Sequence, residues 1–161
     1  MTDVAPAYRL VKARHADAAF HGEGARRFGG LWNSKGRPCV YVASSESLAT
    51  LEVLVHLGQR QPLRGYALFH VRIPAASILY LDAAALPANW RDPLPPAETA
   101  EIGDAWLTGA QSLALAVPSV VVPREVNYML NPGHPEFAKV VTGAERGPFA
   151  FDERLQGQAP R

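Results

Sequence analysis

One stretch of the chain carries a clear helical repeat of apolar residues. Leu48, Leu51 and Val55 recur at the spacing of successive helix turns. This pattern predicts a helix over 46–57 whose core side carries these three side chains. Ser45 stands directly before the repeat, where its hydroxyl can cap the first turn.

The other apolar runs are shorter and are separated by many of the fourteen prolines and thirteen glycines. Ile102, Ala105 and Trp106 predict a second helix over 97–108, with these residues on its apolar side. Runs rich in β-branched and aromatic residues predict strands at 8–12, 38–43, 66–73 and 78–81, and one or two buried strands within 113–122. Weaker strand candidates lie at 137–141 and 149–151.

Two segments show neither a helical nor a strand repeat. Segment 15–36 is expected to be a long loop and segment 127–132 a turn. Helices and strands are interspersed without regular β–α–β alternation, which favours an α+β fold with a mixed, largely antiparallel sheet. At 161 residues the chain has the size of one domain, so a single domain is expected over 1–161, with flexible ends at 1–6 and 153–161.

Composition and charge narrow the classes of function. Hydrophobic residues make up 48% and charged residues 19% of the chain, which is typical of a globular protein. A formal net charge of +1 argues against a broad cationic surface, so no direct binding of nucleic acid is expected. The single cysteine, Cys39, excludes an intrachain disulfide framework and a cysteine-rich zinc site. The N-terminus has no secretion signal and no apolar stretch is long enough to span a bilayer, so a cytoplasmic protein without membrane contact is expected.

Familiar cofactor and metal motifs are absent from the sequence. Segment 22–27 (GEGARR) has an arginine where a dinucleotide-binding fingerprint needs its third glycine. The sequence contains no Gly-Lys-Ser/Thr triplet of a Walker A loop, and no pair of its five histidines has the spacing of a zinc-protease site. Neither a bound cofactor nor a metal is therefore expected, and burial as an inert thiol is expected for Cys39.

The glycine-rich segment 15–36 has two interpretations of equal weight. Its glycines would let the backbone approach a ligand, its basic residues would suit phosphate, and Trp32 would offer a face for stacking. Alternatively, the segment is an ordinary surface loop that a buried Trp32 holds in place.

Glu52 and Tyr41 are candidate site residues on neighbouring predicted elements. Glu52 lies at the edge of the apolar side of the predicted helix and is the only acid between Ala49 and Ala75. A partly desolvated carboxylate there would suit catalysis, although geometry alone favours a solvated glutamate that pairs with a cation. Tyr41 lies near the end of the preceding strand, where it would either reach the same pocket or pack its ring in the core.

A series of short motifs runs through most of the chain in a fixed order. They are GxGA at 22–25, GGxWNSxG at 29–36, VYxAxS at 40–45, LEVLVH at 51–56, PSVVVP at 118–123, ExNY at 125–128 and LNPxHP at 130–135. Each motif alone is weak evidence for a protein family, whereas their order along the chain is fairly specific to one. With these motifs the sequence resembles the RES-domain toxins of bacterial toxin–antitoxin pairs.

The resemblance implies a fold related to ADP-ribosyltransferases and a toxin for which NAD is a substrate, not a cofactor. It implies cleavage of the nicotinamide–ribose bond, so that hydrolysis or phosphorolysis depletes NAD and arrests growth. The alternatives are transfer of ADP-ribose to a protein, and a catalytically inactive variant or binding module. The implied partner is a cognate Xre-type helix-turn-helix antitoxin, and a homodimer is a further expectation.

The resemblance also assigns roles to individual residues. The family's glutamate falls on Glu52, which would hold the ribose hydroxyls and stabilise the developing positive charge. The family's tyrosine falls on Tyr41, which would orient the nicotinamide or its ribose. An early arginine falls on Arg9, for the phosphates, and a late serine falls on Ser119, for a hydrogen bond to the substrate.

One position departs from the family's pattern. The family commonly reads Gly-Gly-Arg-Trp-Asn, whereas this chain has Leu31 before Trp32 and Asn33, three positions expected at the substrate. An arginine there would clamp the NAD diphosphate, but a leucine side chain carries no charge and donates no hydrogen bond. Either Arg26 or Arg27 compensates for the loss, or the substitution was made so that a toxic protein could be produced.

Overall fold

The computed structural model describes residues 3–57 and 61–156. In this part of the chain, seven strands form one sheet in the order β4-β5-β6-β2-β1-β3-β7. The strands are β1 (Val4–Lys12), β2 (Val40–Ala43), β3 (Tyr66–Pro74), β4 (Ile78–Tyr80), β5 (Ala114–Pro118), β6 (Val126–Leu130) and β7 (Glu145–Gly147). β4 and β5 are parallel, and every other neighbouring pair is antiparallel. The predicted α+β fold with a mixed, largely antiparallel sheet is therefore confirmed.

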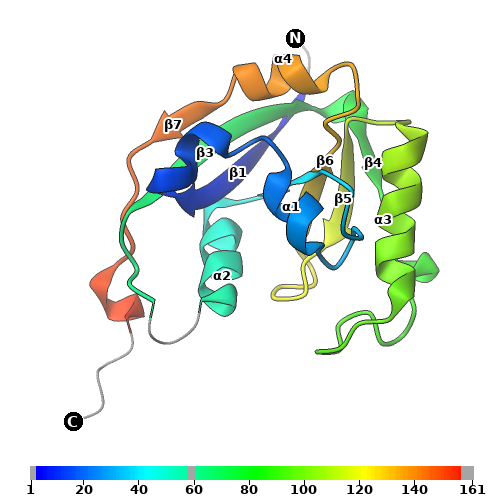
Figure 1. The fold of residues 1–161 in the computed structure, drawn as a ribbon, viewed down its shortest axis with the longest axis horizontal. Helices are drawn as coiled ribbons and strands as arrows, with labels where there is room; N and C mark the ends of the chain where they lie inside the picture. Colours follow the sequence, from blue (N-terminus) through cyan, green and yellow to red (C-terminus); the bar gives the residue numbers. More distant parts are fainter. Residues whose placement is uncertain (1–2, 58–60, 157–161) are drawn as a thin grey trace.

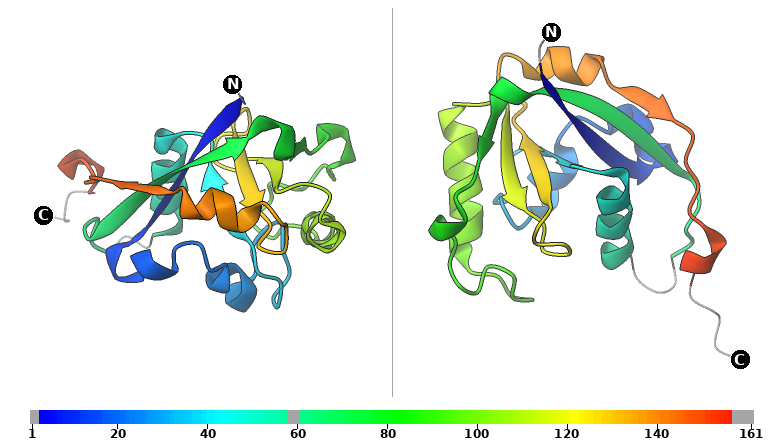
Figure 2. Two further views of the ribbon diagram at one scale, coloured as in Figure 1. Left: turned by 90° about the horizontal axis from the view of Figure 1, so that it is seen from above. Right: turned by 180° about the vertical axis from the view of Figure 1, so that it is seen from behind.

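Helices surround this sheet (Figure 1). Within the described residues the α-helices are α1 (Glu23–Phe28), α2 (Glu46–His56), α3 (Ala97–Gly109) and α4 (Phe137–Thr142), and the 3-10 turns are η1 (Ala13–Ala18), η2 (Ala75–Ser77), η3 (Ala83–Ala85) and η4 (Glu153–Leu155). Figure 1 and the right-hand view of Figure 2 place α4 above the sheet, α3 beside β4 and β5, and α2 below β1 and β2. The helices predicted over 46–57 and 97–108 are thus confirmed. No described helix is both long and apolar enough to cross a membrane.

Three apolar clusters fix the helices to the sheet. The first packs Val140 of α4 against strand residues that include Leu130. The second packs Trp106 of α3 against β5 and β6. The third packs Leu48 of α2 against Leu10 of β1. Burial of a leucine side chain contributes roughly 1.5–3 kcal/mol, so these clusters set where each helix sits.

The buried side of α2 differs from the predicted one. Leu48 is 0% and Ala49 5% exposed, whereas Leu51 is 39% and Val55 56% exposed. The apolar residues of α2 are spread around the helix, so their spacing allowed more than one side to face the core. Contact with β1 and β2 buries the side that carries Leu48 and Ala49. Glu52 lies one turn after Leu48 and therefore points to the same side.

The predicted loop 15–36 contains regular structure, so that expectation is corrected in part. The end of η1 and the whole of α1 lie inside it. Gly22 precedes α1 at φ 74° and Gly29 follows it at φ 71°, in the left-handed region that favours glycine. Glu23 pairs with Arg26 across one turn of α1. A helix of six residues carries too little of a helical repeat to be recognised from its apolar positions.

The predicted turn at 127–132 is largely the central strand β6, so that expectation was wrong. Met129 and Leu130 are 0% exposed, and β6 pairs with β5 on one side and β2 on the other. Asn127 and Asn131 are residues typical of turns, and they masked the strand in the sequence. Pairing on both edges of β6 overrides that local preference.

Two weak strand predictions near the C-terminus are also wrong. Segment 137–141 forms α4, because Val140 packs into the first apolar cluster from a helix. Segment 149–151 belongs to no strand; its Phe149 and Phe151 pack edge to face with ring centroids 4.9 Å apart. The edge strand of this region is β7, which precedes it and pairs with β3.

Both segments predicted to be flexible ends contain regular structure in their described parts. Segment 1–6 contains the start of β1, which pairs with β3 from Val4 onward. Segment 153–161 begins with η4. The other residues of these two predictions, at 1–2 and 157–161, lie outside the described residues, as Figure 2 marks in grey.

Candidate active site

A cavity of about 870 Å³ lies between α1, α2, β1, β2 and the loops that follow η3 and β5. Its volume falls in the range typical of small-molecule sites. The cavity brings together five residues that the sequence assigned to the substrate site, namely Arg9, Leu31, Trp32, Tyr41 and Glu52. Asn33 and Ser119, which the sequence placed in the same site, do not line it.

Glu52 projects from α2 toward the loop between β5 and β6, which lies beside α2 in Figure 1. Its Oε1 accepts two hydrogen bonds, one from Ser119 Oγ at 2.7 Å and one from Asn127 Nδ2 at 2.8 Å. Its Oε2 has no hydrogen-bond partner among the described residues. The carboxylate is thus held through one oxygen, and the other remains for a ligand in the cavity.

Ser119 holds Glu52 from behind the cavity wall. Its side chain is 0% exposed, and its Oγ accepts hydrogen bonds from the backbone N–H groups of Val121 at 3.1 Å and Val122 at 3.0 Å. With both acceptor positions used, the hydroxyl proton goes to Glu52. The predicted hydrogen bond from Ser119 to a substrate would require this buried hydroxyl to leave the carboxylate, so the structure favours a positioning role.

Asn127 is a site residue to which the sequence assigned no role. It lines the cavity from the first part of β6, where it is paired with Ala43 at the end of β2. This register places its amide beside the helix that follows β2 and so within reach of Glu52. Asn127 belongs to the motif at 125–128, which could have marked it as a site residue. Because a turn was predicted there, the sequence did not indicate which side chains the strand directs toward the cavity.

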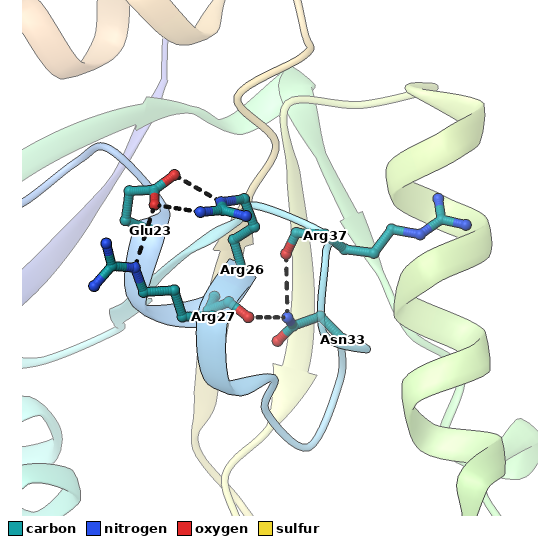
Figure 3. A network of polar contacts seen from close by, with 6 residues as sticks. Glu23, Arg26, Arg27, Asn33 and Arg37 are labelled. Carbon is teal, nitrogen blue, oxygen red and sulfur yellow. Dashed lines mark hydrogen bonds and ion pairs between the residues drawn. The ribbon is translucent and has the colours of Figure 1, made fainter.

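Tyr41 and Asn33 form a buried pair beneath the glycine-rich loop. The Tyr41 hydroxyl donates to Asn33 Oδ1 at 2.6 Å, and Asn33 Nδ2 donates to the carbonyls of Ala25 at 2.9 Å and Arg37 at 3.2 Å. Figure 3 shows the Asn33 amide between these two segments. Asn33 is 1% exposed, and its hydrogen bonds hold α1 and the backbone at Arg37 together. Burial raises the pKa of Tyr41, which keeps its hydroxyl neutral and a donor.

Trp32 anchors the glycine-rich loop on α3. The side chain of Trp32 is 3% exposed, and its carbonyl oxygen would lie only 1.6 Å from a Cβ at Gly103. Two residues further on, the backbone N–H of Ser34 donates to Asp104 Oδ1 at 2.9 Å. Of the two interpretations left open by the sequence, the buried anchor describes Trp32 better, although one side of the residue reaches the cavity.

Arg9 supplies a fixed positive charge in the cavity wall. Its Nε donates to the carbonyl of Ala19 and its Nη1 donates to the carbonyl of Tyr41 at 2.8 Å. Burial lowers the pKa of Arg9 to about 10, which leaves the guanidinium charged at neutral pH. The nearby Cys39 is buried as predicted, and burial raises the pKa of its thiol to about 12. In the part of the chain that the structure describes, no group of three or more His, Cys, Asp or Glu side chains could hold a metal ion.

Arg26 and Arg27, the two residues suggested to replace the missing arginine at position 31, are engaged elsewhere. Both pair with Glu23, with nitrogen–oxygen distances of 2.8 Å for Arg26 and 3.7 Å for Arg27 (Figure 3). Neither side chain lines the cavity. The arginine that does so besides Arg9 is Arg91, from the proline-rich connection between η3 and α3, where no motif marked it.

Comparison with known proteins identifies the family. Residues 6–152 match the RES domain. This chain belongs to the RES domain family. It is 44% identical over 148 residues to the protein named Toxin Res of Photorhabdus laumondii, which covers 92% of this chain and 95% of that relative. It is also 35% identical over 138 residues to the Prs ADP-ribosylating toxin of a Sphingobium strain, which covers 83% of this chain and 84% of the relative.

The fold of this RES domain is also found in a solved structure. It matches a chain of the crystal structure of the M. tuberculosis MbcT–MbcA toxin–antitoxin complex with a TM-score of 0.65 and 24% identity, over 81% of this chain and 75% of that one. The RES domain match spans every motif from which the resemblance was drawn, from 22–25 to 130–135, and confirms that resemblance.

Proposed function

We propose that this RES-domain chain is the toxin of a toxin–antitoxin pair and that it cleaves the nicotinamide–ribose bond of NAD. The observation that carries the proposal is the Glu52 carboxylate, which Ser119 and Asn127 hold through one oxygen at the wall of a cavity of about 870 Å³. Further support comes from a relative at 35% identity that is named an ADP-ribosylating toxin, because ADP-ribosylation from NAD breaks this same bond.

Cleavage of this bond depends more on charge stabilisation than on acid catalysis. Nicotinamide leaves as a neutral ring with the bonding electron pair, so it needs no proton from the enzyme. The ribose carbon becomes oxocarbenium-like and positively charged, as in glycoside hydrolysis. A carboxylate already fixed beside that carbon stabilises the transition state without reorganising. In our proposal Glu52 has this role, with Oε2 facing the ribose.

Arg9 would contact the diphosphate of NAD, and Tyr41 would contact the nicotinamide or its ribose. The charged guanidinium of Arg9 gives the cavity a positive potential that suits the diphosphate. The Tyr41 hydroxyl is engaged by Asn33, so this tyrosine would orient the nicotinamide or its ribose with its ring. Both side chains are fixed before any substrate binds, which lowers the entropic cost of orientation.

The acceptor of the ADP-ribosyl group distinguishes two candidate functions. Water would form a new C–O bond at the ribose carbon, release a proton and give ADP-ribose, and inorganic phosphate would give the corresponding sugar phosphate. A nucleophilic side chain of another protein would instead become ADP-ribosylated. The name of the Sphingobium relative favours this second function as the alternative to NAD depletion.

Release of nicotinamide tests the proposal directly. The purified chain is incubated with NAD alone, with inorganic phosphate, and with a bacterial protein extract, and the products are separated by chromatography. We expect nicotinamide release in which Glu52→Gln lowers kcat by roughly 100-fold or more, the size typical for loss of one fixed transition-state stabiliser. Glu46→Gln is the matched control, because Glu46 lies exposed in the first turn of the same helix. Full turnover by a folded Glu52→Gln variant would overturn the proposal.

A further inference from the structure

We propose that Arg91 binds the diphosphate of NAD in this chain, in place of the arginine that is missing at position 31. The inference rests on the proposed function and adds to Arg9 a second residue that binds the diphosphate. It starts from the position of Arg91, which lines the same cavity as Glu52 but comes from a connection between η3 and α3 that carries no recognised motif.

The guanidinium of Arg91 is oriented by the protein itself. Its Nη2 donates to the carbonyl of Val120 at 2.9 Å, just after the serine that holds Glu52. Its Cζ lies 6.0 Å from the centroid of the Trp90 ring. These two contacts hold an exposed arginine at the cavity, while the rest of its fork of N–H donors remains for a ligand.

Trp90 links Arg91 to the wall segment that carries Leu31. Trp90 packs into the apolar cluster that contains Trp32 and Leu31, and the rings of Trp90 and Trp32 have centroids 6.1 Å apart. Leu31 adds an apolar side chain to this cluster, where an arginine would carry a charge. The cluster therefore anchors Trp90, and the next residue is Arg91. The positive charge that Leu31 lacks is thus supplied to the same cavity by Arg91.

Arg9, Arg26 and Arg27 are less suited to this role. Arg9 uses Nε and Nη1 on backbone carbonyls, whereas Arg26 and Arg27 pair with Glu23 and do not line the cavity. Arg91 forms no ion pair with any described carboxylate, although Asp92 also lines the cavity. It is therefore the cavity arginine with the most N–H groups left for charge-assisted hydrogen bonds to phosphate.

Substitution of Arg91 tests the inference through KM. We expect Arg91→Met to lower kcat/KM for NAD roughly 10- to 100-fold, the effect of losing one or two charge-assisted hydrogen bonds. Most of the change should be in KM, because the diphosphate is remote from the bond that breaks. Nicotinamide riboside has the same bond and no phosphate, so its turnover should not change. A merely structural role would lower turnover of both substrates.

Arg146→Met is the matched control. Arg146 is exposed on the edge strand β7, outside the cavity, and forms no ion pair among the described residues. This variant removes the same charge and should turn over both substrates like the original chain. Equal kcat/KM values for NAD in Arg91→Met and Arg146→Met would overturn the inference and leave the proposed function intact.

Leu31→Arg provides a second, independent test. If Arg91 occupies the role of the missing arginine, Leu31→Arg should restore NAD turnover in the Arg91→Met background by roughly tenfold or more and should improve the original chain by less. Equal gains in both backgrounds would mean that the two positions bind different parts of the substrate, against the inference.

Binding of ADP separates failure of this inference from failure of the proposed function. A chain that releases no nicotinamide contradicts the proposed function, and calorimetry with ADP as the diphosphate probe then still tests Arg91. We expect roughly tenfold weaker ADP binding in Arg91→Met than in Arg146→Met. Equal ADP affinities, or absence of ADP binding in both variants and in the original chain, would overturn the inference.

Discussion

Gly30 leaves no space for a side chain beside the candidate site. A Cβ at this position would lie 2.8 Å from Asn33 Oδ1 and 3.0 Å from the Tyr41 hydroxyl. At the scale of single residues, the candidate site therefore depends on small and polar groups that hold its other side chains in place. Asn33 and Ser119 belong to this class, because one fixes Tyr41 and the other fixes Glu52.

Tyr41→Phe tests whether the tyrosine acts through its ring. The change leaves the buried Oδ1 of Asn33 without its donor, which should cost about 1–3 kcal/mol of unfolding free energy. We expect a lower Tm with kcat for NAD changed less than threefold, since the ring that lines the cavity remains. A large loss of kcat with an unchanged Tm would instead assign the hydroxyl a direct part in catalysis.

At the scale of secondary-structure elements, the side of α2 that is buried decides where its Glu52 side chain lies. Leu48 and Ala49 pack against the sheet, and Glu52 reaches Ser119 and Asn127 only from that orientation. Helix α3 supports the glycine-rich loop from outside the cavity, where Gly103 allows the backbone of Trp32 to approach closely. The two helices thus set the distance between the carboxylate and the glycine-rich loop.

Paired alanine substitutions on α2 test its orientation. Leu48→Ala should lower the free energy of unfolding by about 2–5 kcal/mol, because it empties a fully buried position. Leu51→Ala should change it by less than about 0.5 kcal/mol, because Leu51 is 39% exposed. Urea unfolding of both variants measures the difference. Comparable losses would mean that Leu51 is buried in solution.

Gly103→Ala tests the contact between α3 and the glycine-rich loop. Its Cβ would lie 1.6 Å from the carbonyl oxygen of Trp32, so helix and loop must separate. We expect a loss of at least about 1–3 kcal/mol in unfolding free energy, together with weaker NAD turnover. Gly109→Ala is the control on the same helix, where the nearest atom is Gln111 Cγ at 3.9 Å. Equal Tm values for the two variants would contradict this close packing of α3 against the loop.

At the scale of the whole molecule, the cavity is assembled from segments that are far apart in the chain. β1, α1, β2, α2 and the loops after η3 and β5 each contribute part of its wall. A protein partner that covers this opening would therefore block every proposed substrate contact at once. For a toxin, such a partner is a cognate antitoxin, which we propose to be of the Xre type.

Neutralisation by covering this cavity is the corresponding prediction. We expect nicotinamide release to fall to background when the cognate antitoxin is bound, and hydrogen exchange at α2 and the glycine-rich loop to slow. The reason is steric, so the toxin should recover full turnover once the complex is dissociated. A complex that still cleaves NAD at the rate of the free chain would contradict the prediction.

The sequence by itself determined the parts of this protein that local patterns encode. Helical spacing located α2 and α3, β-rich runs located most of the strands, and ordered motifs identified the RES domain. The same motifs predict Glu52 and Tyr41 as site residues. Periodicity is readable because backbone geometry repeats over a few residues, whatever the rest of the chain does.

Only the tertiary structure decided which surfaces meet. It turned Leu48 and Glu52 of α2 inward instead of Leu51, made a central strand of the segment that holds Asn127, and brought Arg91 to the cavity. Each of these outcomes depends on contacts between residues far apart in the chain. Burial and strand pairing are gained only when those residues meet, and they exceed the weak local preferences of single residues.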